Sequence, residues 1–126
     1  MGKKARTVVD VLKAARWMIE NIGWTQFSDF RDSKGRPIIG ESRLQCVSKI
    51  RSMCLMGALN LVEKEDIRYY HITSMRKKVE RAIQKVCPRW FANTSNTSIS
   101  NFNDDPDRKK EDILRVLDLA IKDAQR

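Results

Sequence analysis

The first helical signal in the chain is the stretch TVVDVLKAARWMIENIG, residues 7–23. Its apolar residues recur at the spacing of one helix face: Val8, Val11, Leu12, Ala15, Ile19 and Ile22. Thr7 and Asp10 form a short capping box, in which each side chain can accept a hydrogen bond from the other residue's backbone N–H. Gly23 is typical of the position just after a helix. The stretch therefore predicts an amphipathic helix over residues 8–22.

Three further helices are predicted from similar patterns. The second spans residues 42–62, because a capping box at Ser42 precedes a broad apolar face. Gly57 costs this helix about 1 kcal/mol of propensity, so we expect a close helix–helix contact there. The third begins at Thr73 or Ser74 and ends before Pro88, and the last opens at Asp105-Pro106. Their apolar lines are Met75, Val79, Ala82, Ile83 and Val86, and Ile113, Val116, Leu117, Ala120, Ile121 and Ala124.

Other segments lack helical spacing. Residues 24–39 surround a turn at 32–35 and predict a small β-hairpin, whose second strand, 36–39, is an edge because Pro37 has no N–H. Residues 93–103 predict a long polar loop, and residues 1–6 a flexible basic arm. We expect a single, mainly α domain over residues 1–126: a compact bundle of about four helices with a small β-hairpin between the first and second.

The charge balance bears on the partner. The chain has 25 Lys and Arg against 16 Asp and Glu, a net charge of +9. Such a surface attracts polyanions, so the expected partner is nucleic acid or an acidic host protein. No apolar run is long enough to cross a membrane, so no membrane partner is expected. The oligomeric state stays open.

The cysteines indicate a reducing compartment. Their odd number argues against a disulfide framework, which favours the cytoplasm. His71 together with Cys46, Cys54 and Cys87 lacks the short cysteine spacing of a structural zinc site. The glycine-rich phosphate-binding motifs and the His-Glu-x-x-His zinc motif are missing too. We therefore predict no metal, no cofactor and no enzymatic activity.

The third predicted helix carries the best candidate for binding. Between Ser74 and Phe91, six cations face one acid, Glu80. Lys77, Arg81 and Lys85 repeat every four residues and so share one helix face, which can follow a line of phosphates. The predicted binding residues are Arg76, Lys77, Lys78, Arg81, Lys85, Arg89 and Trp90, the last as a stacking anchor. The alternative is an ordinary solvated helix with its aromatic residues in the core.

Four short motifs occur in an order that resembles a known family. They are Trp24-Thr25-Gln26, Arg31-Asp32 with Gly35 and Pro37, Cys54 with Gly57-Ala58-Leu59, and Phe102-Asn103-Asp104. The order resembles an uncharacterised family of small actinobacterial and tailed-phage proteins. Phe102 departs from it, since the family prefers tryptophan there, and residues 67–100 match poorly. The resemblance implies a phage or bacterial origin and a place in the cytoplasm of a bacterial host cell, but no particular reaction. We expect a small accessory protein, and inhibition of a host defence or transcription complex is one version of its role.

The same motifs define a second candidate site. Its residues are Trp24, Gln26, Arg31, Asp32, Asn103 and Asp104, which could surround a small polar ligand. This reading gives the alternative function, a small enzyme or a nucleotide- or metal-binding domain that uses the Asp32 and Asp104 region. Helix capping and turn formation explain the same residues without any ligand.

Overall fold

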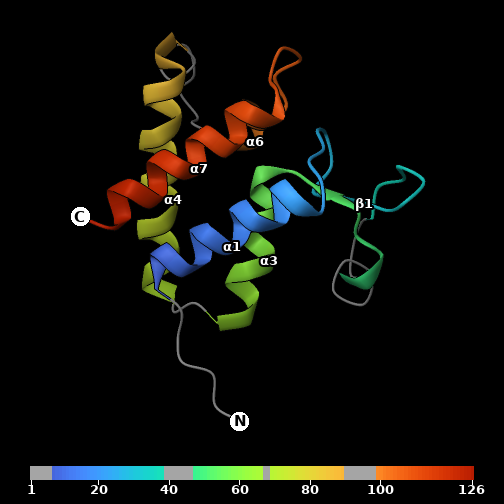
Figure 1. The fold of residues 1–126 in the computed structure, drawn as a ribbon, viewed down its shortest axis with the longest axis horizontal. Helices are drawn as coiled ribbons and strands as arrows, with labels where there is room; N and C mark the ends of the chain where they lie inside the picture. The colour runs from blue at the N-terminus through green and yellow to red at the C-terminus, as the bar shows by residue number, and fades with distance from the viewer. Residues whose placement is uncertain (1–6, 39–46, 67–68, 90–98) are drawn as a thin grey trace.

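The computed structural model of the chain describes residues 7–38, 47–66, 69–89 and 99–126. Four long helices dominate it (Figure 1): α1 (Val8–Asn21), α3 (Leu55–Asp66), α4 (Tyr69–Val86) and α7 (Lys110–Ala124). A short helix, α6 (Ile99–Asn103), precedes α7. Between α1 and α3 lie two short strands, β1 (Phe30–Arg31) and β2 (Ser52–Met53), and a 3-10 turn, η1 (Val47–Lys49). The predicted fold class, a mainly α bundle with a small hairpin after its first helix, is confirmed.

The helices pack around α1. Figure 1 shows α1 in the middle of the molecule, with α7 on one side and α3 on the other. It contacts α3, α7 and α4, and α4 packs along α7. The largest fully buried side chains come from every long helix, for example Leu12, Leu59, Ile83 and Leu117. The described elements therefore share one hydrophobic core, as burial of their apolar faces requires.

Helix α1 follows its sequence closely. It ends at Asn21, one residue before the predicted end, and four residues of its predicted apolar face, Val11, Leu12, Ala15 and Ile19, are buried. The capping box is present, because Asp10 N–H donates to Thr7 Oγ1 and Thr7 N–H donates to Asp10 Oδ2, each at 3.1 Å. Local signals placed this helix because its cap and its apolar stripe lie within the same 15 residues.

The hairpin has a different second strand from the one predicted. β1 pairs antiparallel with β2, with Phe30 opposite Met53, while residues 36–38 make a single bridge from Arg31 to Pro37. Over its described residues, the predicted strand 36–39 is thus reduced to one antiparallel bridge, beside which the Ile38 N–H donates to the Phe30 carbonyl at 2.9 Å. Pro37 has no N–H to extend a ladder, whereas pairing with β2 buries the Met53 side chain completely.

The second predicted helix starts later than expected. The predicted start at Ser42 lies outside the described residues, but η1 and β2 occupy residues 47–53 and α3 begins at Leu55. Gly57 makes a close contact, yet its neighbour is the loop before β1 rather than a helix. An added Cβ would lie within 3.0 Å of the Asp29 carbonyl oxygen. Pairing with β1 holds the chain extended up to Met53, and this overrides the apolar periodicity upstream.

The last two predicted helices also shift their starts. α4 begins at Tyr69 instead of Thr73, since tyrosine and histidine cost an existing helix less than 1 kcal/mol each. α7 begins at Lys110, because Asp105–Asp107 form a turn in which Arg108 N–H donates to the Asp105 carbonyl. The predicted polar loop over 93–103 is wrong at its end, where α6 buries Ile99, Phe102 and Asn103. Residues 93–98 lie outside the described residues.

Candidate functional site

Three cations of α4 lie on the side of that helix that faces solvent. Its opposite side packs into the core through Met75, Val79, Ala82 and Ile83. Lys77, Arg81 and Lys85 are all exposed and stand four residues apart, so they form one stripe. Arg89, just beyond the end of α4, is exposed as well. Trp90, the predicted aromatic anchor, lies outside the described residues.

Two cations of α4, Arg81 and Lys78, are paired with Asp123 of α7. Arg81 donates from Nη2 to Asp123 Oδ2 at 3.2 Å, and Lys78 Nζ lies 3.9 Å from the same oxygen. The hydrogen bond from Arg81 is the largest cause of a lowered pKa at Asp123. Because one carboxylate faces two cations, this part of the surface keeps a net positive charge.

The remaining cations of the predicted set divide between α3 and solvent. Arg76 turns toward α3 and donates from Nη2 to Asn60 Oδ1 at 3.1 Å. Lys77, Lys85 and Arg89 make no hydrogen bond or ion pair with any residue that the structure describes. Three of the six predicted cations are therefore available to an external anion, while the other three contribute to packing between helices.

The motif residues meet at Asn103, which is the one fully buried polar side chain among the described residues. Its Oδ1 accepts from Trp24 Nε1 at 2.7 Å and from the Leu55 backbone N–H at 3.0 Å. Its Nδ2 donates to the Thr25 carbonyl and to Asp104 Oδ1, both at 3.0 Å. Every hydrogen-bonding position of the amide is filled by the protein itself. Asn103 therefore joins the loop after α1, the start of α3 and the end of α6.

Gln26 and Asp104 extend this network to the surface. Gln26 Nε2 donates to the carbonyls of Asn103 at 2.9 Å and Asp105 at 2.7 Å. Asp104 Oδ1 accepts from the Phe27 N–H at 2.8 Å. Phe27 adopts a φ of 66°, a left-handed conformation that is unusual for a large side chain, and its ring is 68% exposed. The network thus holds the loop in a conformation that its sequence alone would not favour.

Arg31 lies beside the network and ties the same loop together. Its Nε donates to Thr25 Oγ1 at 2.9 Å, and its terminal nitrogens donate to the carbonyls of Gln26 at 3.0 Å and Gly35 at 2.9 Å. These donors are used within residues 25–35. The guanidinium accordingly holds residues 25–35 together.

Asp32 stands apart from Asn103 and Asp104 in its interactions. Its Oδ1 accepts from the N–H groups of Lys34 and Arg36, and its Oδ2 accepts from Arg36 Nε at 3.0 Å. The backbone hydrogen bond from Arg36 is the largest cause of a lowered pKa at Asp32. These are the contacts of a side chain that closes a turn. The structure thus joins Trp24, Gln26, Asn103 and Asp104 directly, and no hydrogen bond or ion pair of the described residues links Asp32 to them.

Sequence reasoning missed several interactions around the motif residues, because no local pattern indicates them. Arg108 places its guanidinium 3.8 Å from the centre of the Phe102 ring and donates from Nε to the Phe102 carbonyl. The two residues stand six apart, which is not a helix-face spacing, so no local pattern indicates the pair. The hydrogen bond from the Leu55 N–H could not be predicted either, because any helix begins with N–H groups that lack a partner within the helix.

Cys54 is a buried thiol at the start of α3. Its Sγ accepts from the Gly57 N–H at 3.2 Å and lies 3.5 Å from Asp29 Oδ1, to which it can donate. Burial is the largest cause that raises its pKa, to about 12. The thiolate, which is the nucleophilic form, is thus strongly disfavoured. Within the described residues, no group of three or more His, Cys, Asp and Glu side chains is placed to hold a metal ion.

Cys54 is expected to resist alkylation in the folded protein. At pH 8, a maleimide should label the half-buried Cys87 well before Cys54, as peptide mass spectrometry would measure. Since folding raises the thiol pKa from 9.0 to about 12, Cys54 stabilises the fold below pH 9, and this contribution is lost as the pH rises toward 12. Cys54→Ala should therefore lose stability less steeply above pH 9. Equal labelling rates of Cys54 and Cys87 would contradict this assignment.

Fold and site together define a class: a small, basic, mainly helical protein whose loop after α1 is fastened to α6 through a buried asparagine. Residues 3–123 match the model of DUF6197, a family of unknown function, and the chain belongs to this family. The predicted membership of an uncharacterised family is confirmed, while its occurrence in phages and actinobacteria stays a prediction. Comparison with curated proteins and with solved structures finds no match. Among the described helices, none is both long and apolar enough to cross a membrane.

Proposed function

We propose that this chain is a non-enzymatic binding protein whose α4 surface binds nucleic acid. The observation that carries the proposal is a set of three exposed cations that have no partner among the residues the structure describes: Lys77, Lys85 and Arg89. Lys77 and Lys85 stand about 12 Å apart along the helix axis, at 1.5 Å per residue. Measured along the axis of a duplex, this span corresponds to about three to four phosphates of one strand, at about 3.4 Å each.

The neighbouring ion pairs support the same surface. Lys78 and Arg81 share a single carboxylate, Asp123, so phosphate oxygens can still approach the second charge. The pairing also fixes both side chains against α7, which lowers the entropy lost when an anion binds. The surface is therefore a partly ordered line of cations rather than a set of freely moving lysines.

The arrangement of the motif residues supports a binding protein over the enzymatic alternative. Asn103 has all its hydrogen-bonding positions filled, and Asp32 accepts from two backbone N–H groups. Residues held in this way serve the fold, and a ligand would have to displace protein contacts to reach them. Inhibition of a host defence or transcription complex is a biological role that fits such a binding protein.

Charge reversal on α4 tests the proposal. The double variant K77E/K85E is expected to lower the affinity for a fluorescent single strand and a duplex about tenfold or more, measured by anisotropy at 50 mM salt. The slope of log affinity against log salt should decrease by about 2, since each lysine that contacts a phosphate contributes about 1.

The matched control is K34E/R115E, which makes the same change of net charge at two exposed residues on other elements. It should keep most of the affinity and all of the salt slope. An equal loss in both double variants would mean that overall charge, and not α4, drives binding. If the wild-type chain binds neither nucleic acid at 50 mM salt, the proposal is wrong and an acidic protein surface becomes the candidate.

A further inference from the structure

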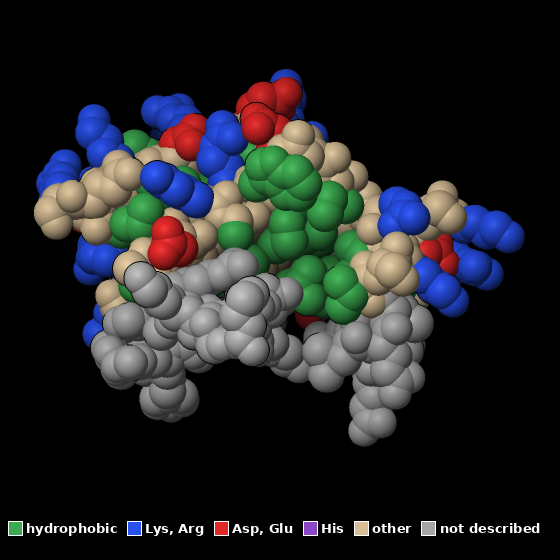
Figure 2. Space-filling view, turned by 60° about the horizontal axis from the view of Figure 1, so that its bottom comes forward, with side chains coloured by type: hydrophobic (Ala, Val, Ile, Leu, Met, Phe, Trp, Pro, Cys, Tyr) green, Lys and Arg blue, Asp and Glu red, His purple; other side chains and the backbone are tan. Residues whose placement is uncertain are grey.

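The surface of the described residues has an apolar groove between α1 and α3. Four large hydrophobic side chains are exposed: Trp17 (59%), Ile22 (39%), Phe27 (68%) and Val47 (45%). Three of these four, all except Phe27, line the same groove of about 420 Å³. Exposed hydrophobic residues are ordinarily scattered, and their clustering marks an interaction surface. Figure 2 shows hydrophobic side chains gathered in the middle of one face, with Lys and Arg on both sides.

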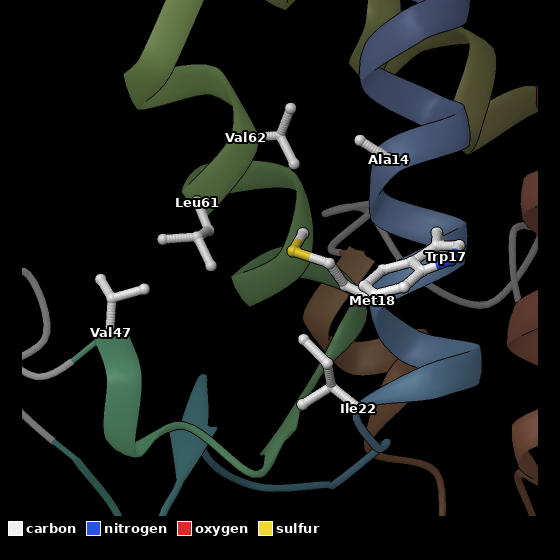
Figure 3. A pocket seen from close by; sticks show the side chains of 7 residues that line it. All are labelled: Ala14, Trp17, Met18, Ile22, Val47, Leu61 and Val62. Atoms are coloured by element: carbon white, nitrogen blue, oxygen red, sulfur yellow. The ribbon is translucent and has the colours of Figure 1, made fainter.

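The groove has the shape of a seat for a helix. Figure 3 shows α1 on one wall, α3 on the other, and Val47 of η1 at one end. Along α1 and its C-terminal cap, the lining residues run from Ala14 to Ile22, about 12 Å or a little over two turns. The lining is apolar apart from the indole N–H of Trp17, so it suits a partner with apolar anchors at helical spacing rather than a polar ligand.

Two exposed lysines stand close in the chain to lining residues of the groove. Lys13 stands one turn before Trp17 on α1, and Lys49 follows Val47 by two residues. Both are exposed, and neither makes a hydrogen bond or ion pair with a residue that the structure describes. The two acids of α1 are already engaged, since Glu20 pairs with Arg16 at 3.2 Å and Asp10 accepts from the Thr7 N–H. Carboxylates of a partner that lies in the groove could therefore pair with Lys13 and Lys49.

We propose that the groove binds an amphipathic helix of a partner protein, with two or three apolar anchors flanked by aspartate or glutamate. Trp17 is the expected main anchor on this side, because exposed tryptophans dominate the binding energy of interfaces. A second copy of the chain is a poorer occupant, since each copy carries a net charge of +9 and would bring further lysines to the rim. No residue of α4 lines the groove, so this surface is separate from the nucleic-acid surface proposed above.

Designed peptides provide the test. The probe is a labelled peptide of about 18 residues, long enough to form a helix, with leucine at positions i, i+3, i+4 and i+7 and glutamate beside them. Two matched peptides replace either every glutamate by lysine or every leucine by serine. We expect the first peptide to bind the wild-type chain and the other two to bind at least about tenfold more weakly, as measured by anisotropy.

Variants of the chain locate the binding. Trp17→Ser should weaken binding of the glutamate peptide about tenfold or more, and its unchanged melting temperature would show that the fold is intact. K13E/K49E should weaken the glutamate peptide and strengthen the lysine peptide. Phe27→Ser removes an exposed aromatic outside the groove, and K77E/K85E removes charge on α4, so both should bind the glutamate peptide as the wild type does.

Several outcomes would overturn the proposal. One is failure of the glutamate peptide to bind the wild-type chain, which is the result expected if the chain's own residues fill the groove. Another is binding that W17S leaves intact or that K77E/K85E abolishes, which would place the peptide on the α4 surface. A dimer in sedimentation that W17S dissociates would make a second copy the occupant instead.

Discussion

Replacement of Asn103 by alanine is expected to lower the free energy of unfolding by about 3 to 6 kcal/mol. The truncation leaves three groups without their partner: the Trp24 indole N–H, the Leu55 N–H and the Thr25 carbonyl. Each unsatisfied buried group costs about 1–3 kcal/mol. A domain of this size is stable by about 5–15 kcal/mol in total, so the variant should lose much of its stability. In a thermal melt followed by circular dichroism, the midpoint should fall by roughly 10 °C or more.

The aspartate variant separates hydrogen bonding from shape. N103D keeps the acceptor for Trp24 and Leu55 but turns an oxygen toward the Thr25 carbonyl and the Asp104 carboxylate. Its stability should therefore rise as the pH is lowered, because protonation of the new carboxyl restores a donor. The deficit of N103A should be nearly independent of pH over the same range.

The exposed Asn21 provides the control, because it allows the same replacement of asparagine by alanine outside the network. Its side chain donates to the Trp17 carbonyl on the surface, so Asn21→Ala should change stability by about 0.5 kcal/mol or less. A loss in N103A no larger than that in N21A would show that the network at Asn103 does not hold the fold together.

Replacement of Gly57 by alanine is expected to destabilise the protein by about 2 kcal/mol or more. The new Cβ would meet the carbonyl oxygen, carbonyl carbon and Cα of Asp29, all backbone atoms that cannot rotate away. The same carbonyl accepts the Cys54 N–H at 3.1 Å, so moving it weakens the start of α3. A clash with backbone atoms lies at or above the upper end of the roughly 1–3 kcal/mol that overpacking costs. A cost of about 3 kcal/mol, less the gain of about 1 kcal/mol in helix propensity, leaves a loss of about 2 kcal/mol.

Gly35 is the matched control. It has a φ of 77°, but an added Cβ there would have no atom within 4 Å. Gly35→Ala should cost about 1–2 kcal/mol from backbone strain alone. The two variants can be compared by urea unfolding. If Gly57→Ala proved as stable as the wild type, the loop before β1 would not be pressed against α3.

The elements whose signals are local could be predicted from the order of the amino acids alone. The cap and the apolar face of α1 lie within one short stretch, and the buried lines of α4 and α7 follow directly from residue spacing. The solvent-facing position of Lys77, Arg81 and Lys85 could be predicted for the same reason, since the periodicity that buries one side of a helix exposes the other. The positive charge of that face needs no tertiary information at all.

Which distant segments meet depends on the packing of the whole chain. Two-residue strands carry no pattern of their own, so the choice of Ser52–Met53 as the partner of β1 depended on the packing around Met53. The motif residues were visible in the sequence, but whether Asn103 faces a ligand or the protein depends on Trp24 and Leu55, which lie 79 and 48 residues away. The groove at Trp17 also appears only when α3 and η1 are placed beside α1. Local spacing fixes the faces of a helix, whereas the partner of each face is a property of the whole fold.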